Sequence, residues 1–202
     1  MADIIYNFCG NPYLNITNQC PCACTFCIRG QAKGLGSAET LWHERDPGWE
    51  EIQSALEQYD FSRAGEAVFC GYGEPFCALA HLGRAAEWIK ERFPTIKLRV
   101  NTNGLGDLIN QRDTAADLAG LIDTISISLN APNSARYNAL CNPEFGEAAF
   151  EAMMNFAKQC KEIYPRVVFS IVDVLTPEEA AHCQAIADQM GIPLRVRKRG
   201  QR

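Results

Sequence analysis

The stretch CPCACTFC, residues 20–27, places four of the chain's ten cysteines within eight residues. Core packing does not explain so dense a group, and its position after a predicted strand marks it as a loop that can gather metal ligands. Cys20, Cys24 and Cys27 have the spacing C-x3-C-x2-C. Three thiolates on one loop can ligate three irons of a cubane cluster and leave the fourth iron without a protein ligand. Cys22 lies between them, and we expect it to be a bystander.

Outward from this loop, short β-rich runs alternate with helical patterns along the whole chain, which is typical of βα units around a parallel sheet. The predicted strands are residues 12–17, 67–70, 96–101, 124–129, 167–174 and 194–196. The predicted helices are residues 49–59, 79–92, 115–121, 146–163 and 177–190. The last helix has the clearest ends, because Thr176 and Pro177 match an N-cap and a first helical residue, and Gly191 matches a C-cap.

Six βα units can form either an open doubly wound sheet or a barrel, and periodicity alone does not separate the two. A complete eight-stranded barrel typically needs about 250 residues, whereas this chain has 202. The chain has room for about six units, which would make a partial barrel. Because single domains mostly contain about 50 to 250 residues, we expect residues 1–202 to form one domain.

Composition excludes several classes of protein. Ten cysteines in 202 residues are too few for a disulfide scaffold. The net charge of −5 provides no general basic surface for phosphates, so nucleic acid is not an expected partner. We see no secretory signal, and no apolar run approaches the roughly 18 residues that span a membrane. We therefore expect no membrane partner and a cytoplasmic protein whose thiols stay reduced.

The C-terminus is a local exception to the acidic balance. Five basic residues fall within the last eight positions: Arg195, Arg197, Lys198, Arg199 and Arg202. Such a run can meet an anionic ligand or partner. We favour the simpler interpretation, a solvated tail.

The C-x3-C-x2-C loop, with Phe26 before its last cysteine, resembles the cluster-binding loop of the radical S-adenosylmethionine (SAM) superfamily. The resemblance implies that Phe26 is one of the cofactor-binding residues. Five stretches extend the resemblance over nearly the whole chain: 13–18, 26–29, 68–75, 101–104 and 121–130. Together they are similar to the small radical SAM proteins associated with TatD-type metal-dependent hydrolases. The resemblance implies a partial (β/α)6 TIM-like barrel, one 4Fe-4S cluster held by Cys20, Cys24 and Cys27, and SAM as cosubstrate.

A second motif, GYGE at residues 71–74, follows the second predicted strand and resembles the GGE-type motif of the superfamily. The resemblance implies that Gly71, Gly73 and Glu74 bind the amino group of the methionine moiety. Glycines let a backbone approach a ligand closely, and an acidic side chain can accept hydrogen bonds from an ammonium group. Elsewhere, a Gly-x-Gly-Glu sequence is more often a tight turn.

Polar residues near the ends of two predicted strands are further candidates. Asn101 and Asn103 end the third strand, whereas Ser126, Ser128 and Asn130 alternate along the fourth and so share one face. In a parallel barrel, the carboxyl ends of the strands carry the active site. The resemblance implies that these groups hold the ribose and carboxylate of SAM. For Ser126, which lies deeper, a buried polar group that serves the backbone is almost as good an interpretation.

The expected reaction is reductive cleavage of SAM to methionine and a 5′-deoxyadenosyl radical, which abstracts hydrogen from a substrate that the sequence does not identify. No residue is assigned to the catalytic step, and Asp173 and Arg195 are candidates for the substrate side. We expect a flavodoxin- or ferredoxin-type electron donor. The resemblance also implies a functional link to a TatD-type hydrolase.

Two alternatives stay open. Within the same class, the chain is similar to 7-carboxy-7-deazaguanine synthases in its shortness and lack of an auxiliary cluster, which would imply a pterin-like or purine-like ring as substrate. In another class, the cysteines of residues 20–27 would hold a zinc ion that only folds the loop of a binding module. Structural zinc sites usually take ligands from two separated segments, which counts against this. The remaining cysteines are expected to be packing residues: Cys9, Cys70, Cys77, Cys141, Cys160 and Cys183.

Overall fold

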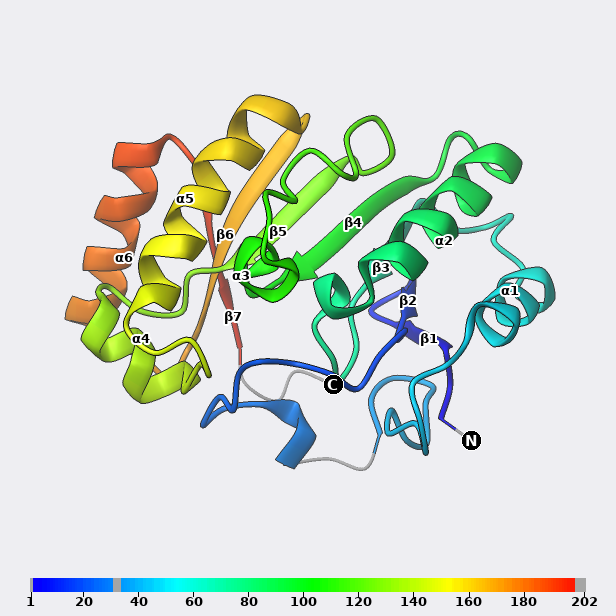
Figure 1. Cartoon of the computed structure of the whole chain (residues 1–202), viewed down its shortest axis with the longest axis horizontal. Coiled ribbons are helices and arrows are strands. Elements are labelled where there is room, and N and C mark those ends of the chain that lie inside the picture. Colours follow the sequence, from blue (N-terminus) through cyan, green and yellow to red (C-terminus); the bar gives the residue numbers. More distant parts are fainter. Residues whose placement is uncertain (1, 31–33, 199–202) are drawn as a thin grey trace.

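The computed structural model describes residues 2–30 and 34–198, which form a single α/β domain around one seven-stranded sheet (Figure 1). The strands are β1 (Ile5–Phe8), β2 (Asn11–Leu14), β3 (Glu66–Phe69), β4 (Lys97–Thr102), β5 (Thr124–Ser128), β6 (Arg166–Val172) and β7 (Leu194–Arg197). The α-helices are α1 (Trp49–Gln58), α2 (Leu79–Arg92), α3 (Gly106–Asn110), α4 (Ser134–Cys141), α5 (Ala148–Ile163) and α6 (Pro177–Met190). Two 3-10 helices are η1 (Ile28–Gly30) and η2 (Pro75–Ala78). In this part of the chain, no helix has the length and apolar character needed to cross a membrane.

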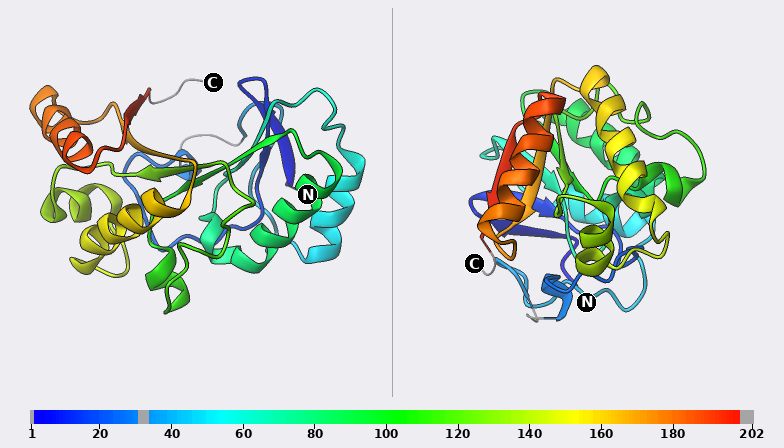
Figure 2. Two further views of the ribbon diagram at one scale, coloured as in Figure 1. Left: turned by 90° about the horizontal axis from the view of Figure 1, so that it is seen from above. Right: turned by 90° about the vertical axis from the view of Figure 1, so that its left-hand side faces the viewer.

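The strands lie in the sheet in the order of the sequence, from β1 to β7. β1 and β2 are antiparallel, and every later pair is parallel. A doubly wound sheet reverses its strand order at a switch point, and this sheet has none. Six consecutive parallel strands with helices on one face make a partial (β/α)6 barrel, which confirms the predicted fold class. In the left panel of Figure 2, β7 and the β1–β2 hairpin rise toward the side that the helices leave uncovered, which we call the inner face.

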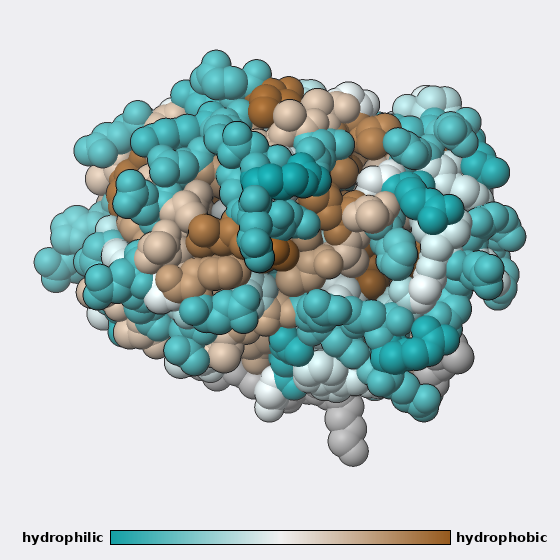
Figure 3. Space-filling view, viewed as in Figure 1, coloured by the Kyte–Doolittle hydropathy of each residue, from teal (hydrophilic) through white to brown (hydrophobic). Residues whose placement is uncertain are grey.

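The outer face of the sheet carries the main hydrophobic core. Ile125 and Ile127 of β5 and Phe169 of β6 are fully buried there, together with Met153 and Phe156 of α5. Burial of such apolar surface is the main favourable contribution to folding. Seen from the helix side, the molecule is mostly hydrophilic, with apolar residues gathered toward the centre of the view (Figure 3).

β1 forms a hairpin with β2 and is not predicted from the sequence. The turn residues Cys9 and Gly10 have φ values of 49° and 80°. Positive φ at both positions belongs to a type I′ turn, which matches the twist of antiparallel strands but usually carries Asn-Gly or Asp-Gly. The predicted strand over 12–17 ends at Leu14, and the extended chain beyond it forms the stem of the cysteine loop.

Helix α6 begins and ends as predicted. Thr176 Oγ1 accepts a hydrogen bond from Glu179 N (3.2 Å), and the Glu179 carboxylate accepts one from Thr176 N (2.9 Å). Pro177 occupies the first helical position, and Gly191 ends the helix with a φ of 60°. These contacts satisfy backbone groups that a helix end leaves unpaired.

The basic C-terminal residues are only partly a tail. Arg195 and Arg197 belong to β7, so they are part of the sheet and not of a tail, although Arg195 is exposed. Their pairing with β6 places both on the inner face of the sheet. Lys198 follows the strand and is exposed, whereas Arg199 and Arg202 lie outside the described residues.

The predicted helix over residues 115–121 is also wrong. These residues form turns, in which Leu121 N donates to Leu118 O (3.1 Å), and Gly120 has a φ of 80°. A helix, α3, lies just before these residues. The sequence patterns predict neither α3 nor α4. Both are short, with five and eight residues, and show little apolar periodicity.

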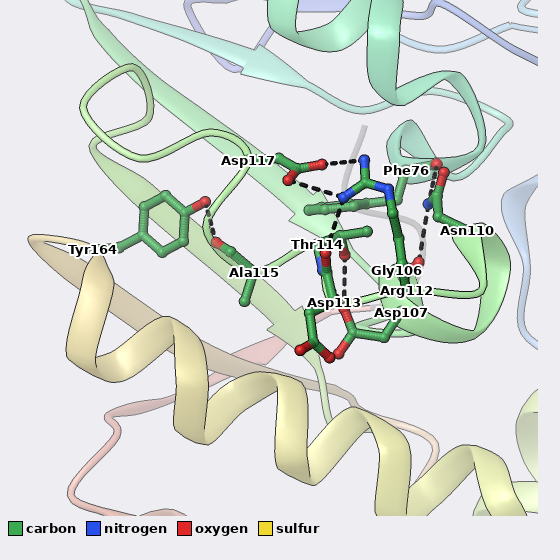
Figure 4. Close-up of polar contacts among 10 residues, drawn as sticks. All are labelled: Phe76, Gly106, Asp107, Asn110, Arg112, Asp113, Thr114, Ala115, Asp117 and Tyr164. Atoms are coloured by element: carbon green, nitrogen blue, oxygen red, sulfur yellow. Dashed lines mark hydrogen bonds and ion pairs between the residues drawn. The ribbon is translucent and has the colours of Figure 1, made fainter.

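Side-chain hydrogen bonds fix these turns (Figure 4). Asp107 Oδ1 accepts hydrogen bonds from Thr114 N (2.7 Å) and Thr114 Oγ1 (2.8 Å). Tyr164 OH donates to Ala115 O (2.7 Å). Such bonds offer the backbone an alternative to the helix, which explains why the apolar spacing here is misleading.

Replacing Asp107 with Ala should remove the acceptor for two polar groups of Thr114, which is fully buried. We expect D107A to lower the free energy of unfolding by about 1 to 3 kcal/mol, the usual cost of a buried unpaired polar group. D107N keeps the accepting oxygen and should retain most of the stability. Chemical denaturation of the metal-free protein measures the effect, with D113A at an exposed position as the matched control. Equal stability of D107A and D113A would contradict this explanation.

Candidate active site

The cysteine loop follows β2 and is fastened to the end of α4. Ala23 N donates to Cys141 O (3.1 Å), and Thr25 N donates to Leu140 O (2.9 Å). α4 itself follows β5, so both segments lie beyond the carboxyl ends of parallel strands. Main-chain hydrogen bonds therefore hold the loop whatever its thiols bind.

The four thiols of the loop differ in burial. Cys22 is 8% exposed and packs in the hydrophobic core. Cys20, Cys24 and Cys27 are partly exposed, and Phe26 packs against the same core from the loop. The loop turns Cys22 inward and leaves the three cysteines of the C-x3-C-x2-C pattern accessible.

The thiols also contact one another. Cys22 interacts with Cys20 and Cys24, and Cys24 interacts with Cys141 of α4. Hydrogen bonds from Cys141 and Cys22 lower the pKa of Cys24, and the bond from Cys22 lowers the pKa of Cys20. The same bonds raise the pKa of Cys22 and of Cys141, whereas burial raises the pKa of Cys27. Because the thiolate is the form that binds metal, these contacts favour Cys20 and Cys24 over Cys22 as ligands.

The stem of the loop, residues 15–19, is held by residues 41–46. Asn15 Nδ2 donates to Leu41 O (2.8 Å), and Thr17 Oγ1 donates to Asp46 Oδ2 (2.7 Å). Asn15 and Thr17 are almost completely buried. Loss of a partner here would leave a buried polar group unpaired, so these bonds fix the stem.

Gly71 and Gly73 are required by the close approach of the GYGE segment to this stem. A Cβ on Gly71 would lie 2.0 Å from Asn15 Oδ1, and one on Gly73 would lie 2.2 Å from Thr17 O. Between them, Tyr72 N donates to Asn15 Oδ1 (3.1 Å). The glycines thus have a packing role without any ligand, and their binding role stays a prediction.

The Glu74 carboxylate is buried and connects the GYGE segment to the end of β4. Its Oε1 accepts hydrogen bonds from Thr102 Oγ1 (2.7 Å) and Phe76 N (3.3 Å). Its Oε2 accepts one from Asn103 N (2.7 Å). Burial raises the pKa of Glu74 to about 7, and the hydrogen bonds oppose that rise. This side chain therefore braces two strand ends, and an ammonium ligand would have to share it with these donors.

Two asparagines of the predicted set lie beside the thiols. Asn103 Nδ2 is 3.8 Å from Cys22 Sγ, and Asn130 Nδ2 is 3.8 Å from Cys141 Sγ. Asn130 is 5% exposed, and no donor among the described residues reaches its Oδ1. An unpaired buried acceptor at this position fits a ligand that donates a hydrogen bond.

The other polar candidates lie along the inner face of the sheet. Ser128 Oγ is 3.5 Å from Arg197 Nη2, and Asn101 Oδ1 accepts a hydrogen bond from Arg99 Nη1 (3.2 Å). Ser128 comes before Asn130, and Asn101 before Asn103, in the direction of their strands. Because the cysteine loop lies beyond the carboxyl ends of the strands, Ser128 and Asn101 are the residues further from it. The structure therefore separates the predicted set into residues at the thiols and residues on the inner face.

Three further candidates are placed away from the thiols. Ser126 and Arg195 line one cavity on the inner face of the sheet. Asp173 follows β6, and its backbone N donates to Arg197 O (3.1 Å).

Sequence reasoning misses several residues that build the site. His43 is 8% exposed, and its Nε2 lies 2.9 Å from Asn15 O and 3.0 Å from Asn15 Nδ2. Asp46 and Cys141 complete the missed group. An asparagine within an apolar strand pattern was a signal for Asn15, but nothing in the sequence pairs Asn15 with His43 or Thr17 with Asp46.

A family model described as the Radical SAM superfamily matches residues 14–190, which include the cysteine loop, the GYGE segment and most of the barrel. The chain belongs to the radical SAM superfamily. Radical SAM proteins are enzymes whose characteristic cofactors are a 4Fe-4S cluster and SAM, and the chain is an enzyme of this class. This favours iron–sulfur chemistry at the loop over the zinc alternative. Among curated proteins, no sequence matches significantly.

Solved structures share the radical SAM fold. The chain is similar to TYW1 with a lysine-pyruvate adduct bound (TM-score 0.62, 13% identity, 93% of this chain and 64% of that chain). It is also similar to Streptococcus suis SuiB bound to S-adenosylmethionine (TM-score 0.63, 16% identity, 93% and 38%). A radical SAM methyltransferase from Sphaerobacter thermophilus is a third neighbour (TM-score 0.63, 17% identity, 96% and 68%). At these identities the likeness concerns the fold alone, and the chain spans only part of each neighbour.

The residues present fit the radical SAM cofactors. Three partly exposed thiols on a fixed loop are a donor set suited to iron, and Asn130 Oδ1 is an unpaired acceptor close by. Among the described residues, no three His, Cys, Asp or Glu side chains already surround one point. The ligand set therefore rests on the spacing and exposure of the three thiols, and ionisation favours Cys20 and Cys24 among them.

Replacing Gly73 with Ala should strain the contact between the GYGE segment and the stem of the cysteine loop. The obstructing atom, Thr17 O, belongs to the backbone, so one of the two segments must move. We expect G73A to lower the free energy of unfolding by about 1 to 3 kcal/mol, as overpacking usually does. The matched control is G65A, whose Cβ would meet nothing within 4 Å. If chemical denaturation finds G73A as stable as G65A, the packing role of this glycine is refuted.

Glu74 should make stability depend on pH. Its pKa is about 7 in the folded protein against an ordinary value of 4.5, so the folded protein holds more protons than the unfolded chain between these values. The contribution of this group is fully present below 4.5 and is lost as the pH rises toward 7. We expect E74Q, which cannot ionise, to show a flatter stability profile over this window than the exposed control E44Q. Urea denaturation at a series of pH values measures both, and parallel profiles would contradict the assignment.

Proposed function

We propose that this radical SAM enzyme binds its 4Fe-4S cluster through Cys20, Cys24 and Cys27 and uses SAM to abstract a hydrogen atom from its substrate. The observation that carries the proposal is the fixed loop of three accessible thiols beyond the carboxyl ends of a partial (β/α)6 barrel. When bound, the cluster supplies the electron that cleaves SAM to methionine and a 5′-deoxyadenosyl radical.

The burial and hydrogen bonding of Cys22 favour a role in stabilising the neighbouring thiolates over a role as a ligand. Its thiol keeps its proton and donates it to the sulfur of Cys20 or of Cys24, one at a time. Hydrogen bonds to the sulfurs are one of the ways in which a protein sets the reduction potential of a cluster. Cys141 donates to Cys24 from α4 and acts in the same way.

The methionine end of SAM is proposed to lie against the backbone of residues 71–74. Glu74 holds this segment to the end of β4, which fixes its carbonyl groups relative to the thiols. Asn130 Oδ1 is available to a hydroxyl or ammonium donor of SAM. Asn103 lies beside the same thiols, and Asn101 and Ser128 would follow the ligand along the inner face.

Phe26 supports the loop rather than the ligand in this proposal, because it packs on the hydrophobic core beside Cys24. It would keep the last cysteine of the pattern in place when the cluster binds. The barrel then excludes water and orients the substrate hydrogen toward the reactive carbon of SAM.

Within the superfamily, we propose the small TatD-associated group, a proposal supported by the sequence stretches 13–18 and 121–130. A flavodoxin- or ferredoxin-type electron donor, a functional link to a TatD-type hydrolase and a cytoplasmic location belong to the same proposal. A reducing compartment is compatible with ten cysteines that are all free. Turnover of 6-carboxytetrahydropterin would instead favour the 7-carboxy-7-deazaguanine synthase alternative.

Cysteine variants test the proposed ligand set. After anaerobic reconstitution with iron and sulfide, C24A should lose most of its iron and acid-labile sulfide and should release no 5′-deoxyadenosine from SAM under reducing conditions. C22A should keep most of its iron and sulfide and most of its SAM cleavage. C9A, which removes an exposed cysteine in the turn between β1 and β2, should do the same. Metal analysis and chromatography of the products provide the measurements. A wild-type protein that binds stoichiometric zinc without iron would refute the proposal, and an inactive C22A would place Cys22 among the ligands.

A further inference from the structure

The inner face of the sheet is polar where a barrel is normally apolar. In complete (β/α)8 barrels, layers of branched apolar side chains fill the interior. The register here places Ser126 of β5 beside Val168 of β6, and Ser170 of β6 beside Arg195 of β7, on the inner face. On β4 to β7, every residue of that alternation except Val168 and Val172 is polar or charged. Departures of this kind from the rules of a fold usually mark function.

Positive charge dominates this inner face. Arg166, Arg195 and Arg197 form no ion pair within the described part of the chain, whereas Arg99 pairs with Glu66 (Nη2 to Oε2, 2.9 Å). The whole chain has a net charge of −5, so the excess is local. Unpaired arginines gathered on one concave face attract anions and raise their local concentration.

Arg166 and Arg195, together with the paired Arg99, line a defined cavity. It has a volume of about 160 Å³. It is lined by Glu66, which is neutralised by Arg99, and by Thr124, Ser126, Arg166, Val168 and Arg195. Whole-ligand pockets usually measure about 300 to 1,000 Å³, so this cavity suits one end of a ligand. Guanidinium forks and hydroxyl donors are the groups that bind carboxylates and phosphates.

Arg197 extends the positive charge from the cavity toward the cysteine loop. Its Nε is buried and has no partner among the described residues, and its Nη2 makes only a 3.5 Å contact with Ser128 Oγ. Burial lowers the pKa of Arg197, and the charge of Arg195 adds to that effect. Arg197 is partly buried, and taking a cation out of water without a counter-charge is costly, so a bound anion would reduce that cost.

We propose that the inner face formed by Arg166, Arg195 and Arg197 binds the acidic group of the substrate, a carboxylate or a phosphate. The cavity lies at the amino ends of β3, β5 and β6, so the substrate class is an anionic molecule that is held by its acidic end on this face and extends along it toward the cysteine loop. The inference rests on the proposed function for the reaction, but the anion site itself does not depend on the cluster.

Binding of simple probes to the metal-free full-length chain tests the proposal. Benzoate, phenyl phosphate and neutral benzamide are titrated while NMR follows the Nε–H signals of labelled arginines. Both anions should cause saturable shifts of the Arg166 and Arg195 signals, and benzamide should cause none. R195Q should weaken the binding of the anions by roughly tenfold or more, the loss expected for one charge-assisted contact. R63Q removes an exposed arginine elsewhere and should bind them as the wild type does.

The relative affinities of benzoate and phenyl phosphate decide between the two acidic groups. Equal binding of benzoate and benzamide, no binding of either anion, or unchanged affinity in R195Q would overturn the proposal. Displacement of the probes from Arg166 and Arg195 by SAM would also overturn it, since the site would then belong to the cosubstrate. If the wild type cleaves SAM but binds no anion, only this inference fails. If it binds the anions but loads no cluster, only the proposed function fails.

Discussion

The close approach of two loops determines the geometry of the site. The GYGE segment after β3 lies directly on the stem that leads from β2 into the cysteine loop, and Asn15 joins them by accepting from Tyr72 N and donating to Leu41 O. The groups proposed to bind iron and those proposed to bind methionine lie on different loops, so their relative position depends on this contact. A side chain at position 71 or 73 would separate the two loops, which explains the glycines before any ligand is considered.

The part of the fold that follows from local sequence was predictable. The alternation of β5 and the capping residues of α6 depend on neighbours a few residues away, and both appear in the structure as expected. The turns at 115–121 were not predictable in this way, because Asp107 and Tyr164 reach them from other elements and outweigh their helical spacing. The hairpin of β1 and β2 was not predicted, because its turn residues, Cys9 and Gly10, are an uncommon sequence for a turn of this type.

The site was predictable to the extent that spacing decides its chemistry. The pattern of Cys20, Cys24 and Cys27 indicated the loop, but its main-chain bonds to the end of α4 decide which thiol turns inward. The same attachment brings Cys141 to Cys24, and no sequence spacing relates these two residues. Glu74 illustrates a similar limit: its motif indicated a ligand-binding carboxylate, while tertiary contacts show that it already receives three hydrogen bonds from the protein.

A partial barrel leaves an open edge, and β7 pairs only with β6 among the described residues. An unpaired strand edge is a template on which another chain can add a strand, and inward-pointing charges are one way in which proteins prevent this. Arg195 and Arg197 have that position on β7. Another molecule that extended the sheet would have to cover both guanidinium groups and remove their water, at a cost in free energy. The two arginines thus place positive charge at the open edge, where it opposes the addition of another strand, and a variant that made β7 apolar would lose this charge together with the proposed anion site.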